Sequence, residues 1–342
     1  MNEHNPQKGR PRKRLRCGIV GLGRQARNDH IPAVSASEHA DLVAACDVDE
    51  DSTHEIGAQY GVNAYRSFAD MLAAESLDFV VVAVPHHAGA AVVSVAAQHG
   101  VHVLKEKPFA TSLDEARDLA KVCADAGVEL MITMQRRFNP IYTTFHQLYD
   151  QIGEPFLVDA RYTMQVDPAA GWRGQLSLAG GGCIIDMGYH VIDMLLWYFG
   201  LPTRVLAQCS AIARPELEYD AEDTACISFG YDSGLFGSVL LSRCISPKTE
   251  VIRVMGTRGM VEVQRGQIRR IHPDGRVIES LSRQQSWPSA ATVQVDHFCR
   301  VIRGERPNLA TPESHLAHAA FIQAAYASAE QECFVNPEEL MA

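Results

Sequence analysis

A glycine-containing loop directly after a short apolar segment constrains the fold of this chain more than any other feature. Residues 15–20 read as a buried strand, and Gly21-Leu22-Gly23-Arg24-Gln25-Ala26 follows at once. In such a loop Gly21 permits a tight turn, and Gly23 lets the backbone approach a pyrophosphate at a helix N-terminus. Ala26 stands where a third glycine is usual and is small enough for close packing between helix and strand. The loop predicts a dinucleotide-binding site, with a purely structural turn as the alternative.

The next apolar segment favours the first interpretation, because it ends in an acid. Residues 42–46 stop at Asp47, 24 residues after Gly23. An acid at this position accepts hydrogen bonds from the adenosine ribose hydroxyls. The three acids that follow, at positions 49–51, would repel a 2′-phosphate, so the expected cofactor is NAD. Arg24 would favour a phosphate and keeps NADP open as the less favoured cofactor.

Strands and helices alternate through the rest of the first half. Buried strands are expected at residues 15–20, 42–46, 79–84, 101–104 and 128–134. A helix over residues 88–99 lies between two of them, and a capping box at residues 112–115 opens another that Gly127 closes. This alternation predicts a parallel, doubly wound sheet.

Glu106-Lys107-Pro108 follows the strand at residues 101–104. Pro108 cannot donate a hydrogen bond to a sheet and restricts Lys107 to extended geometry, so the strand ends there. Ligands bind at the carboxyl ends of the strands in open α/β sheets. Behind a dinucleotide site, Lys107 is therefore expected to face the nicotinamide and to hold the substrate oxygen. The alternative is a surface lysine at a strand end.

The second half has a different pattern. Asn139-Pro140 caps a helix that Gly153 ends, and residues 156–165 alternate as a half-exposed strand. A strongly apolar helix over residues 183–199 follows a triple glycine at 180–182. Further strands are expected at residues 203–213, 223–229, 234–243, 250–255, 260–264 and 267–271. Two helices, near 292–302 and 312–332, follow them.

The apolar helix carries three ionisable residues, Asp186, His190 and Asp193. Their spacing of i, i+4 and i+7 places them on one face, and ionisable groups on a buried helix must be paired or used. Oxidation of an alcohol needs a base for the hydroxyl proton and a cation or donor for the oxygen. His190 has a suitable pKa for the base, Asp186 would orient it or pass the proton on, and Lys107 would hold the oxygen. The alternatives are a helix-dipole contact for Asp186 and a core histidine for His190.

Composition narrows the class of protein further. Apolar residues make up 46% and charged residues 21%, as in ordinary soluble globular proteins, and the length allows two domains. The net charge of -10 argues against nucleic acid or an anionic membrane as a partner, and no apolar run is long enough to span a membrane. Nine cysteines without a C-x-x-C pair indicate reduced thiols, a cytoplasmic location and no metal site. Residues 1–14 are expected to form a solvated, disordered basic tail.

Together these motifs resemble the glucose–fructose oxidoreductase / inositol dehydrogenase / rhizopine-catabolism dehydrogenase family, Gfo/Idh/MocA. The residues that carry the resemblance are 21–26, Asp47, 84–85, 106–108, 135–140, 171–173, 180–182, 186–193, 296–298 and 311–313. The resemblance implies an N-terminal Rossmann domain over residues 15–137. It also implies a C-terminal α+β domain over 138–342, with a large open, mostly antiparallel sheet. Because that sheet often serves in oligomerisation, a homodimer or homotetramer is expected.

The family's pattern also implies roles for single residues. Lys107 is its catalytic lysine, with Asp186 and His190 as the partners typical of its inositol and sugar dehydrogenases. The implied cofactor contacts are Gly21, Leu22, Gly23, Arg24, Gln25, Asp47, Val84, Pro85, Glu106, Lys107, Gln135, Trp172 and Arg173. The expected substrate contacts are Lys107, Arg136, Tyr162, Gln165, Trp172, Asp186 and His190. Many members carry a histidine four residues after Pro85, where this chain has Gly89; His86 and His87 lie nearer to the proline.

The expected function is NAD-dependent oxidation of a secondary hydroxyl of a sugar or an inositol-like cyclic polyol to a ketone, by hydride transfer. One alternative is a redox-neutral glycosidase or epimerase that retains NAD. The other is a non-catalytic NAD-binding sensor, which would not need Lys107, Asp186 and His190 together.

Overall fold

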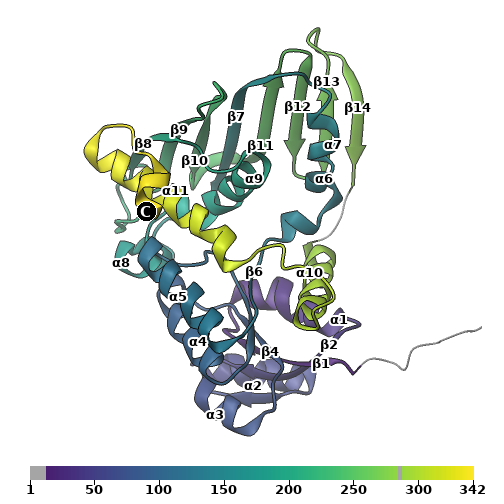
Figure 1. Cartoon of the computed structure of the whole chain (residues 1–342). Coiled ribbons are helices and arrows are strands. Elements are labelled where there is room, and N and C mark those ends of the chain that lie inside the picture. The colour runs from purple at the N-terminus through teal and green to yellow at the C-terminus, as the bar shows by residue number, and fades with distance from the viewer. Residues whose placement is uncertain (1–12, 284–286) are drawn as a thin grey trace, which may run out of the picture.

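Two sheets with helices packed against them make up the chain (Figure 1). The structure is a computed structural model that describes residues 13–283 and 287–342. Of the predicted N-terminal tail, residues 1–12 lie outside this part. Arg14, at the end of that tail, lies within it and forms an ion pair with Asp41 at 2.7 Å.

The first sheet is parallel throughout, with the strand order β3-β2-β1-β4-β5-β6. Its strands are β1 (Leu15–Val20), β2 (Ala40–Cys46), β3 (Asn63–Tyr65), β4 (Phe79–Val82), β5 (His102–Lys105) and β6 (Leu130–Ile132). The strand order reverses between β1 and β4, and in open parallel sheets ligands bind at such a switch point. The predicted doubly wound sheet is confirmed, and β3 is an addition to it.

Helices cover both faces of this sheet. They are α1 (Ile31–Ala36), α2 (Glu50–Tyr60), α3 (Phe68–Ala74), α4 (His86–Gln98) and α5 (Leu113–Ala126). Figure 1 shows α4 and α5 side by side on one face and α1 on the other. The predicted limits of α5 are confirmed, because the Ser112 side chain accepts the Glu115 N–H and Gly127 adopts the left-handed conformation that ends the helix.

The second sheet has the strand order β14-β13-β12-β11-β7-β10-β9-β8. Its strands are β7 (Pro155–Gln165), β8 (Arg204–Ser210), β9 (Thr224–Gly230), β10 (Phe236–Ser242), β11 (Cys244–Gly256), β12 (Gly259–Gln264), β13 (Gln267–Ile271) and β14 (Val277–Ser282). Neighbours are antiparallel except β7 and β10, which run parallel. The large, mostly antiparallel sheet is thus confirmed, and β14 was not predicted.

The predicted apolar helix begins with a π-helical turn, η4 (Ile184–Gly188), and continues as α9 (Tyr189–Phe199). In the turn the Gly188 N–H donates to the Cys183 carbonyl at 2.8 Å, an i to i+5 bond. A side chain on Gly188 would collide with Leu241 of β10, which would lie 2.5 Å from its Cβ. The wider turn changes which residues share a face, so the spacing of Asp186 and Asp193 no longer places them together.

The other helical segments lie along the first sheet, between the two sheets or after the second one. They are η1 (Ala26–His30), η2 (Gln135–Phe138), α6 (Pro140–Thr143), α7 (Phe145–Tyr149), η3 (Gly171–Gly174), α8 (Leu176–Ala179), α10 (Trp287–Ile302), α11 (Pro312–Gln331) and α12 (Pro337–Met341). Although α10 follows the second sheet in sequence, it packs beside α1. Its Phe298 ring also lies 5.6 Å from the ring of Phe79, at the start of β4. The predicted division at residue 137 stays a prediction, since this late helix returns to the first sheet.

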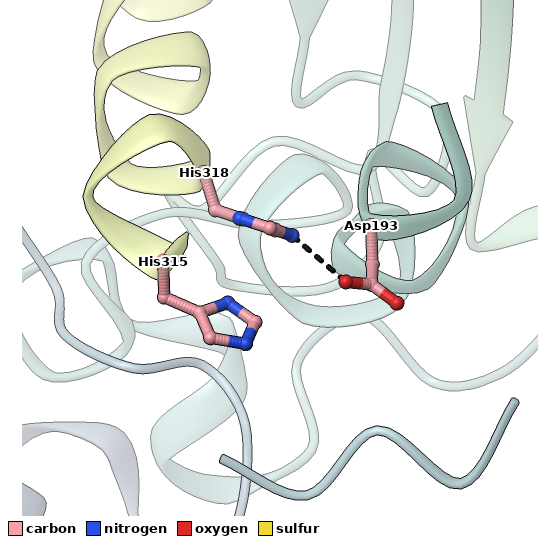
Figure 2. Close-up of side chains that lie close together, drawn as sticks. All are labelled: Asp193, His315 and His318. Atoms are coloured by element: carbon pink, nitrogen blue, oxygen red, sulfur yellow. Dashed lines mark hydrogen bonds and ion pairs between the residues drawn. The ribbon is translucent and has the colours of Figure 1, made fainter. Parts of the chain in front are cut away.

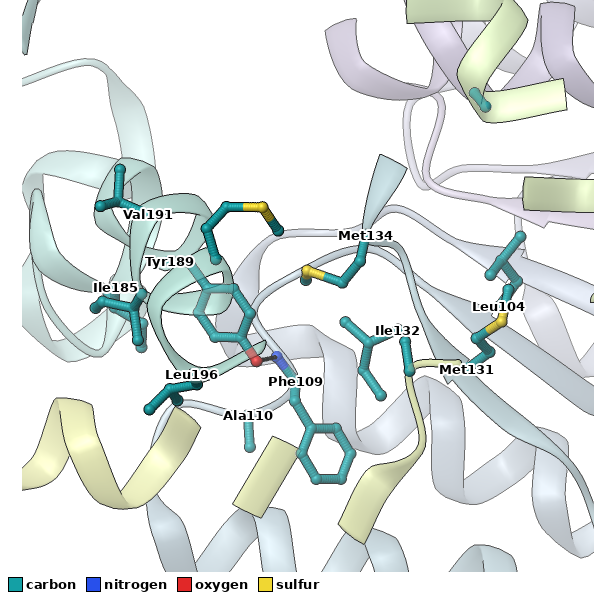
Figure 3. Close-up of a cluster of buried hydrophobic side chains, with 14 of the residues drawn as sticks. Leu104, Phe109, Ala110, Met131, Ile132, Met134, Ile185, Tyr189, Val191 and Leu196 are labelled. Atoms are coloured by element: carbon teal, nitrogen blue, oxygen red, sulfur yellow. Dashed lines mark hydrogen bonds between the residues drawn. The ribbon is translucent and has the colours of Figure 1, made fainter. Parts of the chain in front are cut away.

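A shared apolar core connects the first sheet to α9 (Figure 3). Ile132 and Met134 come from the end of β6 and its loop, while Ile185 and Tyr189 come from η4 and α9. All of these side chains are buried, and the Tyr189 hydroxyl accepts the Phe109 N–H at 3.3 Å. Because this core lies directly behind the loop that carries Lys107, it sets the distance between that loop and η4.

Two expectations from composition bear on the whole chain. All nine cysteines are free, and five of them are buried. Within the described residues, no helix combines the length and the apolar character that crossing a membrane requires.

Candidate active site

A cleft of about 1170 Å³ lies where the carboxyl ends of the first sheet face η3, η4 and the second sheet. Every predicted cofactor and substrate residue lines it except two. Leu22 is buried in the core, and its contribution toward the cleft is its backbone N–H, which donates to Asp47 at 2.6 Å. Gln165 is exposed at the end of β7, outside the lining.

The nucleotide end of the cleft is formed by the glycine loop and the end of β2. Gly21 has a φ of +90°, and a Cβ there would lie 2.5 Å from the Ala83 carbonyl oxygen. A Cβ on Gly23 would meet nothing within 4 Å, so this position opens into the cleft. The Asp47 carboxylate is held by the backbone N–H groups of Leu22 and Asp49. Together these residues fit a dinucleotide with its pyrophosphate over the loop and its ribose on Asp47.

Glu106 is fixed at the base of the cleft. Its Oε2 lies 2.8 Å from His30 Nε2 and accepts the Thr133 hydroxyl at 2.5 Å. Burial alone would raise the pKa of Glu106, but hydrogen bonds and the charges of His30 and Lys107 lower it. Glu106 therefore stays ionised and orients the backbone from which Lys107 projects.

Lys107 and Asp186 form the central ion pair of the cleft. Lys107 Nζ donates to Oδ1 of Asp186 at 2.9 Å and to its carbonyl at the same distance. The other oxygen, Oδ2, lies 3.4 Å from both Arg173 and Arg243. Burial opposes the charge of Asp186, yet Lys107 and the arginines hold its pKa far below the usual range. Asp186 is therefore a permanent anion that anchors Lys107, and it is unsuited to accept a proton.

His190 lines the same cleft one helical turn further along. Burial and the charges of Arg136 and Lys107 hold its pKa well below 6.5, so its ring is neutral. Among the described residues no hydrogen bond fixes either ring nitrogen, and the oxygens of Asp186 face cations instead. The orientation of the imidazole by Asp186 stays a prediction. The expected near-neutral pKa of His190 is not found, because burial and the neighbouring cations lower it.

Trp172 and Arg173 form one wall of the cleft, which a histidine at the start of α4 supports. The His86 ring lies edge-on to Trp172 with centroids 4.4 Å apart, and its Nδ1 lies 2.8 Å from the Ala179 carbonyl. The Arg173 guanidinium stacks over the Trp172 ring at 4.3 Å. Burial lowers the pKa of His86 to about 3, so this contact is made by a neutral ring. His86 thereby links the start of α4 to η3.

Asp193 does not belong to the cleft, which corrects the expectation that three ionisable residues share one face. Its carboxylate is buried and pairs with Arg137 at 2.6 Å and with His318 at 2.9 Å. Figure 2 shows His318 from α11 directed at Asp193, with His315 beside it. Oxygen and nitrogen atoms of these three residues lie within 4.8 Å of one another, a spacing that a metal ion could use. Arg137 already neutralises the carboxylate, so the cluster functions as a buried ion-pair network.

Several lining residues were not predicted, and some of them come from the second sheet or the turns between its strands. The ionisable ones are Asp29, Arg66, His86, His87, Asp167, Arg243, Lys248, Glu250 and Arg265. Glu250 accepts hydrogen bonds from Arg136 at 2.6 Å and from the Tyr142 hydroxyl at 3.0 Å. Arg243 is 3% exposed, and its guanidinium also donates to the Arg173 carbonyl. The sequence around Arg243, Lys248 and Arg265 gives no local signal for the cleft, because the pairing of distant strands brings them there.

Gly89 stands at the position where the family's pattern has a histidine, and the space beside it is already filled. A Cβ at this position would lie 2.9 Å from Cε and 3.1 Å from Nζ of Lys105. Lys105 is buried, and its ammonium donates to the carbonyls of Pro108 and Glu106 at 2.6 and 3.1 Å. Burial lowers the pKa of Lys105 to about 8. The side chain of Lys105 thus uses the space next to Gly89 and holds the loop on both sides of Lys107.

A parallel sheet with a phosphate-binding loop, joined to an open sheet across a cleft with a lysine–aspartate pair, defines a dinucleotide-dependent oxidoreductase. The comparisons with known proteins give the family. Residues 15–134 match the oxidoreductase family with an NAD-binding Rossmann fold, and residues 144–262 match the GFO/IDH/MocA C-terminal domain. The chain belongs to the Gfo/Idh/MocA family. The resemblance seen in the sequence is thereby confirmed, as is NAD as the cofactor of the fold.

Individual relatives cover nearly the whole chain. D-apiose dehydrogenase of Paraburkholderia graminis is 30% identical over 96% of this chain and 92% of its own length. D-xylose 1-dehydrogenase (NADP(+)) 2 of Haloferax volcanii is 31% identical over 92% of this chain and 97% of its own. Among solved structures, the WlbA dehydrogenase of Bordetella pertussis in complex with NADH and UDP-GlcNAcA superposes with a TM-score of 0.81. It is 26% identical and covers 95% of this chain and 99% of its own.

Proposed function

We propose that this protein is an NAD-dependent dehydrogenase that oxidises a secondary hydroxyl of a sugar or cyclic polyol to a ketone. The observation that carries the proposal is the ion pair of Lys107 with Asp186, 2.9 Å long, in the same cleft as the neutral ring of His190. The names of the two relatives, both sugar dehydrogenases, support a sugar as the substrate. Because one of them is a 1-dehydrogenase, the hydroxyl at the first carbon is a second candidate position.

The residues of the cleft divide the work of the reaction. Gly21, Gly23 and Asp47 would hold the dinucleotide, which supplies the hydride acceptor when bound. Lys107, fixed by Asp186, would donate to the substrate oxygen and lower the pKa of the hydroxyl. A ring nitrogen of His190 would take the hydroxyl proton as the electron pair of the C–H bond leaves as hydride. The lowered pKa of His190 makes the ring a weaker base, so this transfer would depend on Lys107 lowering the pKa of the hydroxyl.

A screen of aldoses and polyols for NAD reduction tests this proposal. Lys107→Ala should lower kcat/KM about 100-fold to 1000-fold, because the donor to the developing oxyanion is lost. The matched control is Lys121→Ala, an exposed lysine on α5 that pairs with Asp125. Turnover by Lys107→Ala at the parental rate would contradict the mechanism. Product formation without net NADH would instead indicate redox-neutral chemistry with retained NAD.

The choice between NAD and NADP is tested separately with the unmodified protein. The Asp47 carboxylate is held toward the ribose position by two backbone N–H groups, so a 2′-phosphate would meet a fixed negative charge. We expect kcat/KM with NAD to exceed that with NADP about 10-fold or more. A clear preference for NADP would contradict the role given to Asp47. We also propose a homo-oligomer in the cytoplasm, which light scattering of the purified protein and fractionation of cells would check.

A further inference from the structure

The triple glycine leads into η4, the turn that carries Asp186, and its backbone passes very close to two other elements. Gly181 has a φ of +149°, and a Cβ on it would lie 2.0 Å from the Tyr326 hydroxyl of α11. A Cβ on Gly182 would lie 1.9 Å from the Glu222 carbonyl oxygen. The chain therefore runs directly against Glu222, which lies just before β9 and outside the lining of the cleft.

Glu222 binds three consecutive backbone N–H groups at the start of η4. Its carboxylate accepts the N–H of Gly182 at 2.5 Å and that of Ile184 at 2.9 Å. Its carbonyl accepts the N–H of Cys183, which lies between them, at 2.8 Å. The N–H groups at the start of a helix have no acceptor within the helix itself. One residue from another part of the chain therefore satisfies all three of them.

The carboxylate of Glu222 is held by donors alone. The residue is 8% exposed, and in addition to the two N–H groups the Tyr326 hydroxyl donates to Oε1 at 2.9 Å. Burial and the charge of Glu222 hold the pKa of Tyr326 well above its ordinary value, so the phenol stays protonated. Three donors suit an ionised carboxylate, and the loss of either oxygen would leave a buried donor without an acceptor.

A continuous chain of hydrogen bonds leads from Glu222 into the cleft. The Gly182 N–H donates to Glu222, and the Gly182 carbonyl accepts the Asp186 N–H at 3.1 Å. The carbonyl and the carboxylate of Asp186 each accept a hydrogen bond from Lys107 at 2.9 Å. A shift of Gly182 would therefore move both acceptors of the Lys107 ammonium.

The residue after Glu222 holds a second partner of Asp186. The Asp223 carbonyl accepts the Arg243 N–H at 2.8 Å. The Arg243 guanidinium in turn lies 3.4 Å from the Asp186 carboxylate. The two residues before β9 thus fix Asp186 in two ways, through its own backbone and through one of the cations that face it.

We infer that Glu222 is a positioning residue of the active site, which fixes the Asp186 backbone from outside the cleft and thereby the place of the Lys107 ammonium. This inference rests on the proposed function, because it concerns the same ion pair. Displacement of a reacting group by about 1 Å can cost about 100-fold in rate. A change at Glu222 should therefore lower kcat and leave the dinucleotide, which the glycine loop and Asp47 would hold, nearly unaffected.

Glu222→Gln tests this role with the smallest change in shape. The amide keeps one oxygen but turns an NH2 group toward a donor, so one buried donor loses its acceptor. With the most active sugar of the screen, we expect kcat to fall about 10-fold to 100-fold, with KM for NAD within about twofold of the parent. Tyr326→Phe leaves both backbone contacts in place and should lower kcat about twofold to threefold. Each kcat is expressed per molecule that binds NADH, which removes the contribution of unfolded protein.

Asp193→Asn is the control for a purely structural effect. It also removes a buried carboxylate from the same helical segment, but one that lies outside the hydrogen-bond chain to Lys107. It should lower the free energy of unfolding and leave kcat per NADH-binding molecule close to that of the parent. An equal fall of kcat in Glu222→Gln and Asp193→Asn would overturn the inference. So would a parental kcat in Glu222→Gln, or in Tyr326→Phe if the first variant does not fold.

Chemical labelling separates the inference from the proposed function, because it needs no turnover. The side chain of Lys107 is 12% exposed and paired, whereas Lys121 on α5 is exposed and serves as an internal reference. After acetylation and mass spectrometry, Glu222→Gln should show labelling of Lys107 relative to Lys121 raised about fivefold or more, since a nearby carboxylate favours the charged, unreactive form. This increase without oxidation of any sugar would contradict the proposed function alone. Unchanged labelling of Lys107 would overturn the inference.

Discussion

Asp186 and Asp193 are two carboxylates seven residues apart in one helical segment, and their surroundings differ in a way that separates function from stability. Asp186 faces Lys107, Arg173 and Arg243 across a cleft, with 18% of its side chain exposed. Asp193 pairs with Arg137 and His318 and is 1% exposed. Both carry depressed pKa values. A strongly held charge alone therefore does not identify a catalytic group; access to a cleft does.

The largest expected effect concerns stability at the enclosed carboxylate. Asp193→Asn leaves Arg137 buried without its anion and should lower the free energy of unfolding by about 3–5 kcal/mol. The pKa of Asp193 is depressed, so its stabilisation is fully present above the unfolded pKa of about 3.9 and declines progressively as the pH falls from there toward the folded pKa. Urea unfolding at pH 7 and pH 3 measures the loss at neutral pH and its partial reduction in acid.

The control for this prediction is Asp125→Asn. Asp125 pairs with Lys121 at the surface of α5, where the loss should be below about 0.5 kcal/mol. If Asp193→Asn were no more costly than this control, the two carboxylates would not differ in the way described.

The next effect concerns catalysis at the open carboxylate. Asp186→Asn keeps the shape of the side chain but removes the anion that holds Lys107, so kcat should fall about 100-fold. Its effect on stability should be smaller than that of Asp193→Asn, because the three cations face a cleft that water can enter. Steady-state kinetics and urea unfolding of the same preparation measure the two. A variant that lost stability but kept kcat would reverse the comparison.

Lys105 extends the comparison to a buried cation without a carboxylate partner. Its pKa is about 8 in the folded chain and about 10.4 in the unfolded chain, so the unfolded state binds more protons between these values. Stability should therefore rise with pH, by about 1.5 kcal/mol between pH 8 and 9.5, relative to Lys105→Met. Unfolding of both proteins at the two pH values measures this difference. A difference between the two proteins that stayed constant with pH would show that Lys105 titrates normally.

The smallest expected effect is the absence of a pH inflection. Because burial and nearby cations hold the pKa of His190 well below 6.5, its ring stays neutral as the pH falls toward 5.5. The logarithm of kcat/KM should therefore show no downward bend near pH 6.5. An inflection there that disappeared in His190→Gln would show that the ring titrates normally and that the cations of the cleft do not reach it.

Local patterns were sufficient to predict five strands of the first sheet and its glycine loop, but not the short edge strand β3. The turn at Gly21, the acid at the end of β2 and the proline after Lys107 each depend on a few neighbouring residues. Arg243 and Lys248 could not be predicted in this way, because the pairing of β7 with β10 and β11 brings them to the cleft. The π-helical turn was also missed, since the contact of Gly188 with Leu241 on another element accompanies it.

The end of the Lys105 side chain fills the space beside Gly89. A side chain at position 89 would therefore compete with Lys105 for that space. A histidine at position 89, as in many members of the family, would overlap the ammonium of Lys105 and displace the contacts that fix the loop around Lys107. A histidine at position 89 therefore requires the end of the Lys105 side chain to leave this space. Engineering that introduces the histidine consequently acts on the loop around Lys107 through Lys105, whose ammonium holds that loop.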